Sequence, residues 1–138
     1  KALRRHVQKA FLDVHLCVNE PEQYVEELAD AGASRMTFHY EATSDPEKLA
    51  ARVHSLGMQA GLAIAPSTSM TSRLLDVARF FDVVLVMTVS PGFGGQAFLP
   101  EVLPKLTSLR HAYPEKSLEV DGGVNLETVV AAANAGAN

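Results

Sequence analysis

Hydrophobic residues along the 138-residue chain follow two patterns that alternate. Short apolar or period-two runs, typical of β-strands, occupy residues 11–18, 36–41, 60–64, 83–89 and 118–121. Longer stretches with apolar residues at helical spacing occupy 21–31, 45–56, 71–79, 100–111 and 125–136. Residues 1–9 have the pattern of the end of a further helix. The pattern predicts five strand-plus-helix units in succession, with no linker between them.

Residues with specific backbone preferences mark the predicted helix boundaries. Pro21 and Pro46 stand in first turns, where a missing N–H costs little, and Asn125 is expected to cap the last helix. Gly32 and Gly57 follow two of the helix ends. Units of about 25 residues are too long for hairpins and predict a parallel sheet. That sheet is either an open, doubly wound sheet or part of a (β/α)₈ barrel.

Two of the strands carry information about their surroundings. The run 83–89 is continuously apolar and rich in β-branched residues, which predicts a strand covered on both faces. The run 11–18 places Asp13 and His15 on one face and Leu12 and Val14 on the other. In a barrel the apolar face would meet the helices, and the polar face would look into the barrel mouth.

Glycines follow the ends of two strands that are consecutive in the sequence. Gly92, Gly94 and Gly95 lie in the loop after 83–89, before a helix expected from about residue 98. Gly122 and Gly123 follow the strand that ends at residue 121. Convergent backbone N–H groups beside a helix N-terminus bind phosphate. An isolated glycine cluster would indicate only a flexible loop, but its recurrence in the next unit favours a phosphate site.

Composition narrows the class of protein. The chain is 47% hydrophobic and 20% charged, which suits a single domain over residues 1–138. No run approaches the length of a membrane span, and the first residues lack the apolar segment of a signal peptide. One cysteine excludes an internal disulfide framework, and a net charge of −4 without a basic stripe argues against nucleic acid. We therefore expect a cytoplasmic protein with neither a membrane nor a nucleic-acid partner.

Five motifs together resemble one known family. They lie in residues 13–15, 37–43, 61–66, 86–96 and 119–124, the fourth of which contains Pro-Gly-Phe-Gly-Gly-Gln. Their identity, order and spacing resemble the ribulose-phosphate 3-epimerase family over essentially the whole chain. The resemblance implies a TIM barrel that interconverts D-ribulose 5-phosphate and D-xylulose 5-phosphate in the pentose phosphate pathway. It also implies proton transfer at carbon 3 by two aspartates through an enediolate. A homodimer is a further expectation.

The resemblance assigns roles to individual residues. Asp121 would be a catalytic acid or base and a metal ligand, and His15 a second ligand that also touches substrate. One divalent cation is implied, and imidazole and carboxylate ligands suit Zn²⁺, Fe²⁺, Mn²⁺ or Co²⁺ equally. The residues implied to surround substrate and its phosphate are His15, Met87, Gly92, Phe93, Gly94, Gly95, Asp121, Gly122 and Gly123.

The chain departs from the family pattern in several places. A family strand with His-x-Asp, holding the second aspartate, would precede Lys1, and a phosphate-binding Gly-Ser would follow Asn138. We therefore expect an incomplete barrel of about five units. Cys17 stands where the family usually has methionine. Two residues from His15 on the inward face, it could approach the metal, but the interpretation that we favour is a small buried hydrophobe. His39 and Glu41 match the family but are interpreted as structural residues outside the metal site.

Two other functions fit the same pattern. A phosphate cradle says little about sugar length, so an epimerase for a related hexulose 6-phosphate is one alternative. The other is a non-catalytic homologue that binds sugar phosphate weakly or serves as a dimer-forming subunit.

Overall fold

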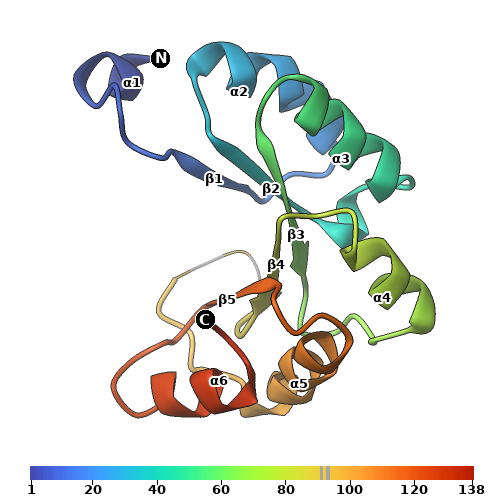
Figure 1. Ribbon diagram of the computed structural model, residues 1–138. Coiled ribbons are helices and arrows are strands. Elements are labelled where there is room, and N and C mark those ends of the chain that lie inside the picture. The colour runs from blue at the N-terminus through green and yellow to red at the C-terminus, as the bar shows by residue number, and fades with distance from the viewer. Residues whose placement is uncertain (91, 93) are drawn as a thin grey trace.

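Five parallel strands form one sheet in sequence order, as the computed structural model of residues 1–90, 92 and 94–138 shows (Figure 1). The strands are β1 (Asp13–Leu16), β2 (Arg35–His39), β3 (Gln59–Ile64), β4 (Val83–Met87) and β5 (Ser117–Asp121). Each strand pairs in parallel with the next, so every connection has to cross back over the sheet.

Helices make these crossings and lie along the outer side of the arc of strands (Figure 1). The α-helices are α1 (Ala2–His6), α2 (Val25–Ala31), α3 (Pro46–Ser55), α4 (Ser72–Ala78), α5 (Leu103–Ala112) and α6 (Val129–Ala135). Short 3₁₀ turns are η1 (Pro21–Tyr24), η2 (Tyr40–Ala42) and η3 (Pro100–Val102). Within the described ranges, none of the helices has both the length and the apolar character needed to cross a bilayer.

The two faces of the sheet have different surroundings. Alternate residues such as Phe38, Leu62 and Val84 point outward and join the main core, which the helices complete. The intervening residues, such as Leu85 and Met87, form a small apolar cluster on the inner face. All residues of β4 are buried, so the prediction of a strand covered on both faces is confirmed.

Ion pairs on the inner face show that the sheet is strongly curled. The guanidinium Nη1 of Arg35 on β2 lies 2.7 Å from Glu119 Oε1 on β5 and 3.3 Å from Asp13 Oδ2 on β1. Strands β3 and β4 separate β2 from β5 in the sheet, so a flat sheet could not make the first contact. Of the two predicted architectures, the incomplete barrel is therefore the one adopted.

Several predicted boundaries were wrong. The first strand begins at Asp13 rather than at residue 11, and Glu41 lies in η2 rather than on a strand face. The last helix begins at Val129 rather than at Asn125. The side-chain oxygen of Asn125 accepts hydrogen bonds from the N–H groups of Glu127 (2.8 Å) and Thr128 (3.1 Å). Asn125 therefore organises a turn that precedes the helix.

Two arginines anchor the ends of helices in the same way. Arg4 donates from Nε and Nη2 to the carbonyl of Gly32 at 3.0 and 2.5 Å. Arg110 repeats the arrangement with the carbonyl of Gly136 at 3.1 and 2.7 Å. Both glycines are left-handed caps that end the helix of the following unit. The repeated contact fixes each helix against the one before it.

The inner layer of the sheet has no room for a side chain at Gly61. A Cβ there would contact Oγ1 of buried Thr37 and would lie 2.9 Å from Val83 Cγ1. We expect Gly61→Ala to lower the free energy of unfolding by about 1–3 kcal/mol through overpacking. Denaturant unfolding measures this. Gly94→Ala is the control, because a Cβ there meets nothing within 4 Å. Equal stability of the two variants would contradict the prediction.

A second test of the fold concerns Asp82. Its carboxylate accepts hydrogen bonds from Nε2 of His54 and the N–H of Ala60, each at 2.8 Å. Burial raises the pKa of this carboxyl, but the two hydrogen bonds outweigh burial and the pKa lies below its ordinary 3.8. A pKa lowered by folding means that the ionised carboxylate stabilises the fold above about pH 4 and that this contribution is lost as pH falls.

We therefore expect Asp82→Asn to destabilise the protein by about 1 kcal/mol near neutral pH, with the difference shrinking below about pH 4. Denaturant unfolding at neutral and acidic pH measures it. Asp30→Asn is the matched control, because the Asp30 side chain is exposed and makes no hydrogen bond to the described residues. A deficit for Asp82→Asn that is constant with pH would contradict the prediction.

Candidate active site at the strand C-terminal ends

The carboxyl ends of the strands surround a cavity of about 300 Å³. The predicted site residues that line it are His15, Met87, Gly92, Gly94, Gly95, Asp121, Gly122 and Gly123. Phe93, also predicted, lies outside the described residues. The structure thus brings together, in one place, side chains and glycines from β1, β4, β5 and the loops that follow them.

His15 and Asp121 meet across this cavity. His15 lies near the end of β1 and Asp121 is the last residue of β5, so they come from opposite edges of the sheet. Curling of the sheet brings His15 Nδ1 to 3.6 Å from Asp121 Oδ2. Two ligand atoms at this separation can share one divalent ion, because each metal–ligand bond is about 2.0–2.2 Å long.

The protonation of His15 suits a ligand. Burial lowers its pKa, and the neighbouring His39 lowers it further, although the carboxylates of Asp121 and Asp13 act in the opposite direction. The imidazole is therefore neutral at physiological pH and keeps one nitrogen lone pair available for bonding.

The loop after β5 approaches the loop after β4 so closely that it requires glycine. Gly122 and Gly123 have φ angles of 117° and 64°, which favour glycine. A Cβ on Gly122 would lie 2.7 Å from Val89 Cγ1, and one on Gly123 would lie 2.5 Å from the backbone nitrogen of Phe98. The two glycines thus allow the two loops to form one continuous rim.

Thr88, which sequence reasoning did not single out, joins the same two loops. Its N–H donates to the carbonyl of Asp121 at 2.8 Å, and its hydroxyl donates to the carbonyl of Gly122 at 2.5 Å. Its own carbonyl accepts from the N–H of Leu99 at 2.8 Å. Thr88 is fully buried, so these bonds hold the backbone that carries Asp121. A polar residue directly after an apolar strand was the available signal.

The glycine loop itself is exposed at Gly92, Gly94 and Gly95. The Gln96 side chain donates to the carbonyl of Ser90 at 2.6 Å, which ties the two ends of the loop together. The helix expected from about residue 98 begins later, with η3 at Pro100 and α5 at Leu103. Proline lacks the N–H that an earlier turn would use, which fits a start at Pro100. Phosphate binding here remains a prediction.

The sequence that forms this rim is similar to the sequences of known proteins over the whole chain. The model of the ribulose-phosphate 3 epimerase family matches residues 1–138. The chain belongs to this family. A ribulose-phosphate 3-epimerase of Schizosaccharomyces pombe is 54% identical over 140 residues, covering 100% of this chain and 61% of the relative. The cytoplasmic isoform of rice, Oryza sativa subsp. japonica, is 45% identical over 141 residues, covering 100% of the chain and 61% of the relative.

Similarity extends to bacteria. A ribulose-phosphate 3-epimerase of Mycobacterium leprae is 41% identical over 129 residues, which cover 91% of this chain and 57% of the relative. Across these relatives, the chain spans about three-fifths of the epimerase length. Residues 1–138 therefore correspond to a part of an epimerase barrel, as the number of strands also indicates.

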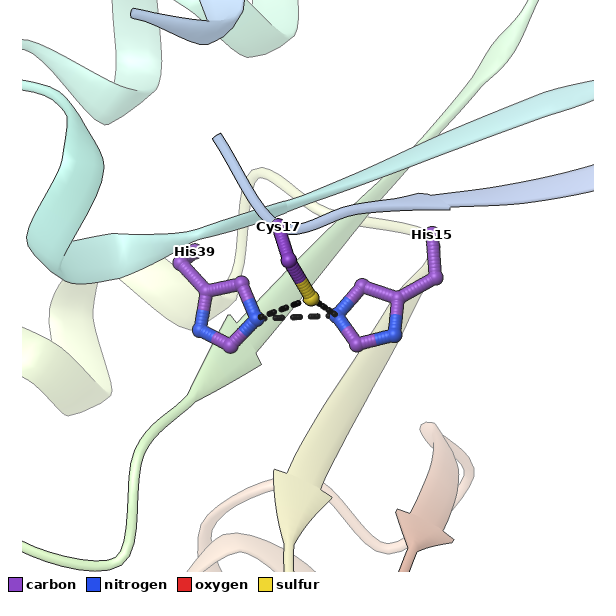
Figure 2. A group of neighbouring side chains, drawn as sticks. All are labelled: His15, Cys17 and His39. Atoms are coloured by element: carbon purple, nitrogen blue, oxygen red, sulfur yellow. Dashed lines mark hydrogen bonds between the residues drawn. The ribbon is translucent and has the colours of Figure 1, made fainter. Parts of the chain in front are cut away.

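Two residues that sequence reasoning did not assign as metal ligands, Cys17 and His39, lie against His15. The Nε2 atoms of His15 and His39 are 2.9 Å apart, and Cys17 Sγ lies 3.8 Å from the first and 3.7 Å from the second (Figure 2). Cys17 is exposed, so its interpretation as a buried hydrophobe was wrong. Cys17 directly follows the last residue of β1, two residues after His15, and lines the same cavity.

Glu41 lies beside His39 Nδ1, on the side of the ring opposite the nitrogen that faces His15. Its carboxylate accepts a hydrogen bond from the N–H of Ala65 at 3.0 Å and another from the Thr68 hydroxyl, and lies 3.5 Å from His39 Nδ1. Burial raises the pKa of Glu41, but the bonds from His39, Thr68 and Ala65 outweigh it and lower the pKa to about 2. Glu41 is therefore a charged and firmly held partner, consistent with the structural role predicted for it.

Proposed function

We propose that this chain supplies one half of the catalytic rim of an enzyme that interconverts D-ribulose 5-phosphate and D-xylulose 5-phosphate. The observation that carries the proposal is the convergence of His15 Nδ1 and Asp121 Oδ2 to 3.6 Å from opposite edges of the sheet. Membership of the epimerase family supports the choice of reaction.

Asp121 would move the proton at carbon 3. Its side chain is 57% exposed at the cavity, so a substrate can reach it, while its backbone is held by Thr88. Removing a proton next to a ketone requires a base close to that carbon, and a carboxylate can serve as one. A proton returned from the opposite face needs a second acid, which we assign to the family's His-x-Asp strand, expected before residue 1.

His15 and Asp121 would also hold one divalent cation. A neutral imidazole and a carboxylate are a donor pair that suits Zn²⁺, Fe²⁺, Mn²⁺ or Co²⁺, and their separation fits a shared ion. When bound, such a cation supplies positive charge that stabilises the enediolate oxygens of the substrate.

The remaining cavity residues would bind and orient the sugar phosphate. Gly92, Gly94 and Gly95, with Gly122 and Gly123, expose backbone without side chains, which lets a phosphate approach N–H groups closely. Met87 projects from β4 on the inner face, is only 4% exposed, and pairs in register with Asp121. It would cover the apolar side of the reacting carbons and exclude water.

The setting of the enzyme is also a proposal. We place it in the cytoplasm and in the pentose phosphate pathway, and expect a homodimer without nucleic-acid or membrane partners. The rice relative named as a cytoplasmic isoform supports this location.

A chimera tests the proposed function. Residues 1–138 would replace the matching segment of the Schizosaccharomyces pombe epimerase, which supplies the rest of a barrel around a segment 54% identical. We expect turnover of D-ribulose 5-phosphate in a coupled assay, and little turnover of allulose 6-phosphate. A folded chimera without either activity would favour a non-catalytic homologue, and preference for the hexulose would identify the related epimerase.

A further inference from the structure

Three potential metal ligands converge at the edge of the proposed active site without involving Asp121. They are His15 Nε2, His39 Nε2 and Cys17 Sγ, which lie within 4.8 Å of one another (Figure 2). In a tetrahedral zinc site, two nitrogens lie about 3.3 Å apart, and a nitrogen and a sulfur lie about 3.6 Å apart. The observed separations are 2.9 Å between nitrogens and 3.7 and 3.8 Å to sulfur. A small outward shift of one ring would accommodate the ion.

The far side of each imidazole carries the partner that a metal-binding histidine needs. His15 Nδ1 faces Asp121 Oδ2 at 3.6 Å, and His39 Nδ1 faces Glu41 Oε2 at 3.5 Å. A carboxylate at Nδ1 fixes the hydrogen on that nitrogen and leaves the lone pair on Nε2, directed at the metal. Both rings are therefore oriented to present Nε2 to the same point, beside the sulfur.

We propose that His15, Cys17 and His39 form a zinc-binding site that is separate from the His15–Asp121 pair. Two imidazoles and a thiolate are a ligand set that favours Zn²⁺ over Mn²⁺ or Mg²⁺. The thiol proton of Cys17 leaves to solvent when the ion binds. A second cavity, separate from the one at His15 and Asp121, is lined by Cys17 and His39 and gives water access to the site. Because Cys17 is exposed, the ion reaches the site from solvent.

A metal ion bound by His15, Cys17 and His39 prevents His15 and Asp121 from sharing a second ion. A neutral imidazole has a single lone pair, so His15 can bind a metal through Nε2 or through Nδ1 but not through both. Zinc held by Cys17 and His39 therefore places a hydrogen on Nδ1 of His15, where it bonds Asp121. Zinc bound at this site therefore makes His15 unavailable as a ligand of the metal ion proposed for catalysis.

Binding of Co²⁺, used as a spectroscopic substitute for Zn²⁺, tests the site. Titrating Co²⁺ into residues 1–138 and into the chimera is expected to give a sulfur-to-cobalt charge-transfer band in the near ultraviolet. Added Zn²⁺ should remove the band and protect Cys17, the single cysteine of the 138 residues, from alkylation followed by mass spectrometry in the 138-residue chain. Circular dichroism checks that each variant is folded.

Variants separate this site from the catalytic one. Cys17→Ser should abolish the band, and His39→Gln should weaken Co²⁺ binding by about tenfold or more. Asp121→Asn should keep the band, because its side-chain oxygen still accepts from His15 Nδ1. Absence of the band from both folded proteins, or its loss in Asp121→Asn alone, would overturn the proposal. Neither result depends on epimerase activity, so the proposed function stands or fails separately.

Discussion

Asp121→Asn in the chimera is expected to abolish exchange of the carbon 3 proton with solvent. The substitution removes the group proposed to carry the proton and one negative ligand charge in a single step. Loss of a general acid or base alone costs about 10²–10⁴-fold in rate, and we expect an effect at or above the upper end of that range. Deuterium incorporation from heavy water into ribulose 5-phosphate, followed by NMR, measures it.

Glu119→Gln is the matched control for this variant. Glu119 lies on the same inner face of β5, two residues earlier, but its carboxylate pairs with Arg35 at 2.7 Å rather than facing the cavity. We expect it to reduce stability and to leave proton exchange in the folded protein largely intact. Normal exchange in Asp121→Asn, or an equal loss in both variants, would remove Asp121 from its proposed role.

Residues 1–138 prepared by themselves are expected to show no measurable epimerisation. Among the described residues β1 and β5 each pair on one side only, so both edges of the arc are open. Large apolar side chains are exposed in the segment that follows β5, including Leu126 at 92% and Val130 at 59%. Open edges and exposed apolar surface favour association. The proposed mechanism also needs a second acid that we place outside these residues.

A coupled assay measures epimerisation of D-ribulose 5-phosphate by the purified 138-residue chain. The chimera is the positive control, and Asp121→Asn checks for contaminating host epimerase. Light scattering reports association in the same samples. Turnover by the isolated chain that disappears in Asp121→Asn would show that one carboxylate is sufficient and that the two-acid mechanism is wrong.

The sequence alone determined which elements form and which end of the sheet carries the chemistry. Period-two runs identified the strands, and the continuous apolar run identified β4 as buried on both faces. Asp13 and His15 on one face of β1 indicated that this strand turns a polar face to the inside of the sheet. Glycines directly after β4 and β5 placed the candidate site at the strand C-terminal ends, because parallel strands bring those ends to one rim.

The tertiary structure alone decided which residues touch across that rim. Periodicity states which face a side chain occupies, but distances between strands that are not neighbours depend on how strongly the sheet curls. Curling brings Asp121 to His15 and Glu119 to Arg35 across the sheet. On neighbouring strands, side-chain rotamers direct the ring of His39 toward Cys17 and His15. A linear pattern carries neither the curvature nor these rotamers. The sequence placed Cys17 near His15 on one face, but only the folded chain brought His39 beside them.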